Sequence, residues 1–153
     1  MKNQIVILFL AVISATSFAQ TAAKRTKEFN LENKVAIQGY DPVAYFTQKK
    51  AVKGKSAFTS TYEGVIYNFS SQANKDAFLK NPISYEPQYG GWCAYAMGAN
   101  GEKVEVDPET FKIVDGKLNL YYNAYFNNTL KSWNKDEVNL KKKADANWKK
   151  FIN

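Results

Sequence analysis

Apolar and aromatic residues recur with a strand-like spacing in two stretches of the chain, each interrupted by a short polar turn. Residues 57–69 are rich in aromatic and β-branched residues around Glu63-Gly64, and residues 111–122 repeat this pattern around Asp115-Gly116. A glycine at the second position of a two-residue turn tolerates left-handed backbone angles, which such hairpins require. Both stretches are therefore predicted to be β-hairpins, and residues 103–106 are also strand-like.

Other stretches have the wider spacing of helices. Residues 72–79 place alanines and Phe78 on one helical face, and the following Asn81-Pro82 predicts the end of that helix, because a residue before proline avoids helical angles. Residues 92–97 form a second short helical pattern, which Gly98 is expected to terminate. A third helix is expected over residues 124–132.

The last part of the chain is predicted to be an amphipathic helix. Leu140, Ala144, Trp148 and Phe151 recur at intervals of four, four and three residues, so they share one helical face, with lysines on the other. The fold class expected from these elements is α+β: a small antiparallel β-sheet made of two hairpins, packed with short helices, and a C-terminal amphipathic helix that docks on the domain.

The beginning of the chain has the pattern of a secretory signal peptide over residues 1–19. Lys2 precedes the apolar run Ile5–Ile13, and Ser17-Phe18-Ala19 offers small residues at the cleavage positions. We expect an exported protein, periplasmic or extracellular, with residues 20–34 as a flexible N-terminal segment, residues 35–130 as one domain, and residues 131–153 as a basic C-terminal helix packed on it.

Charge is concentrated at the C-terminal end. The chain has 21 basic and 14 acidic residues, a formal net charge of +7, and residues 131–150 contain seven lysines against three acidic residues. Such a face is either simply solvated or contacts an anionic surface or an acidic protein partner. Because an exported protein rarely meets nucleic acid, a nucleic-acid partner is not expected.

Cys93 is the only cysteine of a chain that has no histidine. Catalytic triads, Cys-His pairs and histidine-based metal sites all need imidazole, so these classes of site are excluded. A single cysteine also forms no disulfide within the chain. Any chemistry with soft metals or thiols therefore falls on Cys93.

Three residues are candidates for a metal site. Cys93 follows two glycines near a predicted helix start, where backbone N–H groups and the helix dipole favour a thiolate. Met97, four residues later, would place a second sulfur on the same helical face, and a soft pair of this kind selects Cu(I). Asp107, or a neighbouring tyrosine, is a candidate third donor. The alternative reading is that Cys93 and Met97 are ordinary core residues.

Aromatic side chains offer a second kind of site. Tyr40, Tyr67, Tyr89 and Trp92 are candidates to line a cleft for a small ligand, although aromatic residues of a small domain usually belong to its core.

Many short motifs, in order, resemble those of YHS domain proteins of the exported bacterial type. The resemblance covers roughly residues 35–130. Its residues are Gly39-Tyr40-Asp41-Pro42-Val43-Ala44-Tyr45-Phe46, Phe58, Tyr62, Gly64, Tyr67, Phe69-Ser70-Ser71, Asn74, Phe78, Pro82, Tyr85, Pro87, Tyr89-Gly90-Gly91, Cys93-Ala94, Asp107-Pro108 and Ile113-Val114-Asp115-Gly116-Lys117-Leu118.

The resemblance implies a small α+β domain of a family that is suspected of binding metal, copper especially. The family is named for a Tyr-x-His-Ser-like motif, and the matching place here is Tyr67-Asn68-Phe69-Ser70, with phenylalanine instead of histidine. A metal site that depends on this imidazole is therefore absent, and Cys93, which matches the family cysteine, remains as the soft ligand.

We therefore expect an exported binding module for a metal ion, copper first, or for a small ligand, rather than an enzyme. A resolving cysteine and a histidine base are both missing, which disfavours catalysis. Two alternatives remain open: a thiol redox protein centred on Cys93, and a partner-binding domain that uses the aromatic cleft and the basic helix. The expectation of copper binding also depends on the oligomeric state, because Cys93 from two chains would complete a two-coordinate Cu(I) site.

Overall fold

The computed structural model describes residues 21–153, so the predicted signal peptide lies outside the described residues. The first predicted hairpin is confirmed: β3 (Lys55–Tyr62) and β4 (Val65–Phe69) pair antiparallel, and the turn residues Glu63 and Gly64 have left-handed φ angles of 44° and 83°. Beyond β4 lie β2 (Val35–Ala36), paired parallel to it, and then β1 (Leu31–Glu32), paired antiparallel to β2.

The second predicted hairpin is also confirmed. β5 (Asp107–Val114) and β6 (Lys117–Tyr121) pair antiparallel around Asp115-Gly116, whose φ angles are 50° and 71°. Residues 103–106, expected to be strand-like, are irregular instead. The carbonyl of Val104 accepts a hydrogen bond from the Cys93 amide at 2.9 Å, so this segment bonds to the start of a helix rather than to a neighbouring strand.

The prediction of one helix over residues 124–132 is wrong for the first half of that range. β7 (Asn123–Ala124) and β8 (Asn127–Asn128) form a third, very short hairpin, and helix α6 spans only Thr129–Trp133. The helix starts here because the side chain of Asn128 accepts a hydrogen bond from the Leu130 amide at 3.0 Å, which caps its first turn.

Short helices and turns connect these strands. Helix α3 (Gln72–Lys80) begins at Ser71, whose hydroxyl accepts a hydrogen bond from the Asn74 amide, and ends before Pro82 as predicted. The remaining short elements are the 3-10 turns η1 (Ile37–Gly39) and η2 (Gln88–Gly91) and the helices α2 (Ala44–Thr47), α4 (Pro82–Tyr85) and α5 (Ala94–Ala99).

The predicted C-terminal amphipathic helix is α7 (Glu137–Ile152), which packs against α5. Leu140 and Ala144 of the predicted stripe are buried. Gly98 does not terminate α5, which continues to Ala99. A Cβ at Gly98 would lie 2.5 Å from the carbonyl oxygen of Leu140, so glycine is needed there for the close approach of the two helices.

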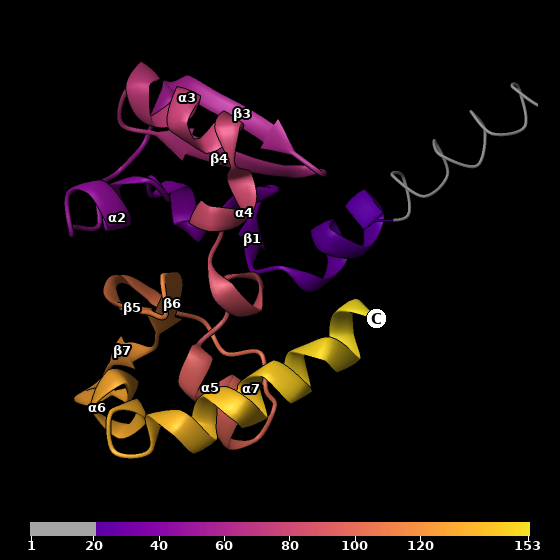
Figure 1. The fold of residues 1–153 in the computed structure, drawn as a ribbon, viewed down its shortest axis with the longest axis vertical. Coiled ribbons are helices and arrows are strands. Elements are labelled where there is room, and N and C mark those ends of the chain that lie inside the picture. Colours follow the sequence, from indigo (N-terminus) through magenta and orange to yellow (C-terminus); the bar gives the residue numbers. More distant parts are fainter. Residues whose placement is uncertain (1–20) are drawn as a thin grey trace, which may run out of the picture.

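Residues 21–28 are helical, which differs from the flexible segment expected for residues 20–34. The polar sequence gives no local signal, because the helix is held by distant residues. Arg25 forms an ion pair with Glu86 and approaches Glu63 at 3.4 Å, and its guanidinium lies 4.5 Å from the centre of the Phe29 ring. In Figure 1 this helix lies near the end of α7.

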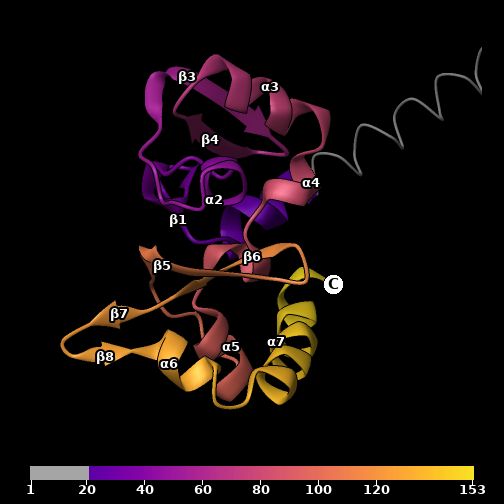
Figure 2. The ribbon, with the colours of Figure 1, turned by 60° about the vertical axis from the view of Figure 1, so that its left-hand side comes forward.

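The elements form two layers joined by the segment around α4 and η2. Figure 2 shows β3, β4, α2 and α3 in one layer and the β5–β6 hairpin with α5, α6 and α7 in the other. One buried cluster spans both layers, since it contains Tyr67 of β4 and Leu120 of β6, and a second lies under α7 around Trp133. Among residues 21–153, no helix combines the length and the apolar composition that crossing a membrane requires.

Candidate thiol site around Cys93

The turn η2 positions Cys93 at the start of α5. The last three residues of η2 have left-handed φ angles of 56° to 88°. A Cβ at Gly90 would lie 2.7 Å from a ring carbon of Trp148, so the turn requires glycine at this place. The turn leads the chain into the interior, where the Cys93 amide is bonded to Val104.

The Cys93 side chain is fully buried and has two hydrogen-bond partners. The amide of Tyr122 donates to the Sγ at 3.4 Å, and the Sγ lies 3.4 Å from the hydroxyl oxygen of Thr129. Thr129 has one hydroxyl proton, which it donates to the Tyr122 carbonyl at 2.9 Å, so its oxygen accepts from the thiol S–H. In these contacts the thiol both donates and accepts a hydrogen bond.

The helix start does not supply the expected stabilisation of a thiolate. Cys93 occupies the N-cap position of α5, but its side chain accepts no hydrogen bond from the first amides of that helix. The donor to its sulfur comes instead from the Tyr122 amide, just after β6. The second hairpin and α6 therefore hold the thiol in place, and the contacts give no sign of activation at the helix N-terminus.

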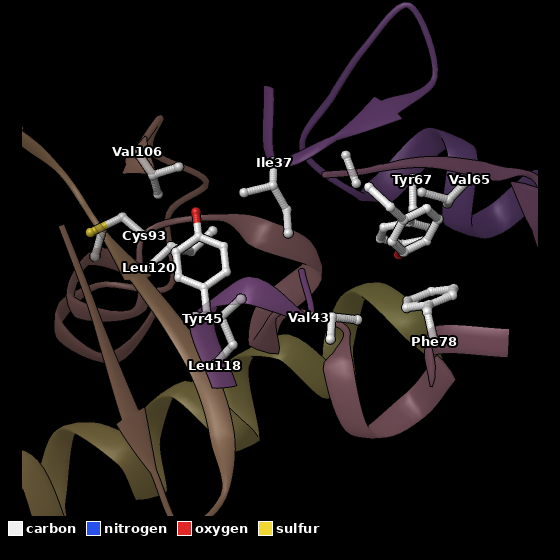
Figure 3. Packing of buried hydrophobic residues seen from close by; sticks show 13 residues of the cluster. Ile37, Val43, Tyr45, Val65, Tyr67, Phe78, Cys93, Val106, Leu118 and Leu120 are labelled. Carbon is white, nitrogen blue, oxygen red and sulfur yellow. The ribbon is translucent and has the colours of Figure 1, made fainter. Parts of the chain in front are cut away.

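A pocket of about 280 Å³ adjoins the thiol. Figure 3 shows Cys93 at the margin of the large buried cluster, in the part that also contains Val106 and Leu120. The pocket is surrounded by residues from the start and body of α5, the loop after it, the residue after β6, β8 and the start of α6: Cys93, Tyr95, Ala96, Ala99, Asn100, Glu102, Val104, Tyr122, Asn127 and Thr129. Cys93 is thus among the lining residues of this pocket, although its side chain is fully buried.

Met97 does not join Cys93 in a two-sulfur site. Its amide bonds to the Cys93 carbonyl at 3.0 Å, as expected one helical turn later, and its side chain is fully buried. That side chain belongs to the cluster under α7 with Trp133, whereas Cys93 belongs to the cluster shared with Leu120. Within residues 21–153, no group of three or more Cys, Asp or Glu side chains is placed to hold a metal ion.

Asp107, the candidate third donor, stabilises a turn at the start of β5. One carboxylate oxygen accepts from the Glu109 amide and the other from the Thr110 hydroxyl, both at 2.9 Å. These local bonds explain the Asp107-Pro108 pair as a turn former. Asp107 is not among the residues that line the thiol pocket.

The first two candidate tyrosines bond to carboxylates in different places. Tyr40 donates to Glu109 at 3.2 Å, and Tyr67, which is buried in the large cluster, donates to Glu86. Burial raises the pKa of Tyr67 well above its ordinary value, and the neighbouring Glu86 raises it further. Both phenols therefore remain neutral hydrogen-bond donors.

Tyr89 and Trp92 likewise have separate partners. The Tyr89 hydroxyl donates to Asp145 of α7 at 2.9 Å, and the Trp92 indole donates to the Glu28 carbonyl at 2.7 Å. Burial also raises the pKa of Tyr89. The four predicted aromatic residues thus connect different elements and do not converge on one cleft.

Asp41 is a conspicuous buried polar residue whose role the sequence indicated only in part. Its Oδ1 accepts from the amides of Val43 and Ala44, as the side chain of a helix cap does. Its Oδ2 accepts from the amide and the hydroxyl of Ser70 and from the Asn74 side chain, at 2.6–2.7 Å. The signal was present in the Gly39–Phe46 and Phe69–Asn74 motifs, but nothing local shows that the two motifs meet.

The sequence model of the YHS domain family matches residues 43–89, from α2 through the first hairpin and α3 to η2. The match ends four residues before Cys93. Searches for similar curated proteins and solved structures gave no match. Residues 43–89 of this chain are therefore similar to the YHS domain family.

Proposed function

We propose that the protein is an exported binding module whose site is the pocket at Cys93, with a soft metal ion, Cu(I) first, as its ligand. The YHS family is often linked to metal binding, copper included. One observation carries the proposal: Cys93, the only cysteine of the chain, is among the residues that line a pocket, although its side chain is fully buried.

The donors present fit a two-coordinate site rather than a closed cage of three or four protein ligands. Cys93 supplies one thiolate, which favours Cu(I), while Met97 faces another cluster and Asp107 another turn. The second soft donor then comes from outside the chain, either Cys93 of a second copy or a small thiol. Because metal displaces the thiol proton, the affinity should rise with pH.

The surroundings of Cys93 favour binding over catalysis. The partners of its sulfur are the Tyr122 amide and the Thr129 hydroxyl, and neither is a base at neutral pH. The redox alternative requires a reactive thiolate. A buried thiol that donates its proton should instead be alkylated at least about tenfold more slowly at pH 7 than a small free thiol, and rapid alkylation would favour the redox alternative.

The direct test is an anaerobic titration of the protein lacking residues 1–19 with Cu(I) against a competing chelator, with and without added glutathione. We expect one metal per two chains, or one per chain when glutathione is present, and a loss of tight binding in Cys93→Ser. Met97→Leu is the matched control, because it changes the other buried sulfur of α5 and should bind as the unchanged protein does.

Equal binding by the unchanged protein and by Cys93→Ser would reject the copper proposal. A loss of binding in Met97→Leu, with an unchanged circular dichroism spectrum, would show a two-sulfur site and reject the site described above. Mass spectrometry of the loaded protein distinguishes the paired chain from the glutathione adduct.

Export is part of the proposal, and it is supported by the pattern of residues 1–19. Expression of the full chain in a Gram-negative host should give a periplasmic product that begins at Gln20, whereas the chain without residues 1–19 should remain in the cytoplasm. A full-length product found in the cytoplasm would count against export.

The lysines of α7 favour a second candidate function, contact with an anionic surface. Lys142, Lys143, Lys149 and Lys150 are exposed on this helix. Binding to anionic vesicles that weakens with added salt and is unchanged in Cys93→Ser would support it, whereas binding that does not depend on salt would reject it.

A further inference from the structure

A second hollow, of about 380 Å³, lies between the N-terminal helix, α4 and the end of α7, on the side of the molecule where these three elements meet. It does not include Cys93. The residues that line it are Thr21, Lys24, Arg25, Phe29, Glu63, Ile83, Glu86, Pro87, Gln88, Tyr89, Gly90, Lys117, Trp148 and Ile152.

The hollow has an apolar wall and an apolar rim. The rings of Phe29 and Trp148 pack with their centres 5.9 Å apart. Ile83 and Ile152, at two places on the rim, are 62% and 41% exposed, which places them among the large apolar side chains that the fold leaves uncovered. Exposed isoleucines around an aromatic-lined hollow indicate a surface that binds an apolar group.

The charges of the hollow are unevenly compensated. Arg25 pairs with both carboxylates of the lining, Glu86 and Glu63, and its side chain and that of Glu86 are each only 13% exposed. Lys24 and Lys117 form no ion pair with a carboxylate side chain among the described residues. Lys24 donates instead to a backbone oxygen of Asn153, so the cation that remains to attract a ligand is Lys117.

Each of these lysines lies beside one of the exposed isoleucines. The Lys117 ammonium is 3.5 Å from the carbonyl oxygen of Ile83, and the Lys24 ammonium donates to a backbone oxygen of Asn153, the residue after Ile152. The rim therefore combines an apolar side chain and a positive charge at two separate places.

We propose that this hollow binds a small amphipathic carboxylate, with its apolar body against Phe29 and Trp148 and its carboxylate at the rim near Lys117. The aromatic wall and the isoleucines provide the area for the apolar body, and the lysine provides charge-assisted hydrogen bonds for the carboxylate. This site is separate from the Cys93 pocket and does not depend on the copper proposal.

The test uses decanoate as the probe, below its micelle concentration, with the protein lacking residues 1–19. Titration is followed by calorimetry and by tryptophan fluorescence, and decan-1-ol serves as the uncharged counterpart. We expect saturable binding of decanoate with a change in fluorescence that is lost in Trp148→Phe. We also expect at least a fivefold weaker affinity in Lys117→Gln and in Ile83→Ser.

Two matched variants control for charge and exposed apolar surface elsewhere. Lys142→Gln and Val138→Ser alter α7 at residues that line a different hollow, so both should bind decanoate with unchanged affinity. Cys93→Ser should also leave this affinity unchanged, which separates the test from the copper titration. Circular dichroism checks that every variant is folded.

The absence of saturable binding, or equal affinity in the unchanged protein, Lys117→Gln and Ile83→Ser, would overturn the proposal. Decan-1-ol that binds as tightly as decanoate, with no effect of Lys117→Gln, would overturn the assignment of an anion as the ligand.

Discussion

Asp41 shows how a single buried carboxylate joins two parts of the chain. Its two oxygens accept five hydrogen bonds: two from the start of α2, two from Ser70 just after β4, and one from Asn74 of α3. An ionised carboxylate has only acceptor sites, so it suits a place where every neighbour donates. The residue therefore acts as a cap for α2 and as a link to Ser70 and Asn74.

Replacing Asp41 by asparagine should lower the free energy of unfolding by about 2–4 kcal/mol, because an amide NH2 would face donors where an acceptor is needed. Urea unfolding followed by circular dichroism measures this loss. Asp76→Asn, at an exposed position whose carboxylate accepts a hydrogen bond from Gln72, should change the stability by less than about 0.5 kcal/mol. A loss below about 1 kcal/mol in Asp41→Asn would contradict the proposed role.

The candidate site could be predicted from the sequence only as far as Cys93 itself. A single cysteine without any histidine stands out in the composition, so the residue needed no structure to be found. Its partners could not be found in this way. Thr129 follows it by 36 residues, and the second partner is the Tyr122 amide, a backbone group that every residue except proline has. The same limit made Met97 seem a partner, since helical spacing alone ignores which cluster each side chain enters.

At the scale of elements, the β7–β8 hairpin has an unusual turn. Tyr125 and Phe126 have left-handed φ angles of 49° and 65°, which bulky residues rarely adopt, and their side chains are almost fully exposed. Neither ring gains much from packing in this position. The hairpin therefore forms despite its turn residues, held by the β7–β8 pairing and by the bonds of Thr129 to Tyr122 at its base.

Phe126→Gly should raise the stability by about 1 kcal/mol relative to Phe126→Ala, because both variants remove the exposed ring but only glycine adopts the left-handed angle without strain. Thermal and urea unfolding of the two variants give the comparison. If the alanine variant is as stable as the glycine variant, the turn is not strained.

The contrast among the three hairpins shows where the fold was predictable. Glu63-Gly64 and Asp115-Gly116 carry glycine at the second turn position, so the turn residues alone were sufficient to predict these two hairpins. Tyr125-Phe126 carries no turn signal, and its sequence was read as part of a helix. The N-terminal helix was missed for a different reason, because Arg25 is held by Glu86, 61 residues later in the chain.

At the scale of the whole molecule, two ion pairs fasten its terminal helices. Lys103 bonds to Glu28 at the end of the N-terminal helix, and Lys112 of β5 bonds to Glu137 at the start of α7. The hydrogen bond from Lys103 lowers the pKa of Glu28, and that from Lys112 lowers the pKa of Glu137. Both carboxylates are therefore more acidic in the folded chain than in the unfolded one.

A carboxyl group whose folded-state pKa is lowered stabilises the fold above its ordinary pKa, and this contribution is lost as the pH falls through the lowered value. Stability should therefore decline on acidification below the ordinary range of glutamate, and the decline should be shallower in Glu28→Gln and in Glu137→Gln. Urea midpoints from pH 7 down to acid measure it. Glu102→Gln is the control, since Glu102 forms no ion pair with a described residue, and an equally steep decline in all three variants would contradict the assignment.

The meeting of the N-terminal helix with the end of α7 has a consequence for how the chain folds. Phe29 packs against Trp148, and Lys24 bonds to a backbone oxygen of Asn153, 129 residues away, so these contacts have nearly the largest sequence separation that the described chain allows. Contacts of high sequence separation form late, because their loop must close first. The first helix therefore reaches its final position only after the last helix has left the ribosome. If the chain is exported, this delay keeps it incompletely folded, and so fit for translocation, until synthesis is nearly finished.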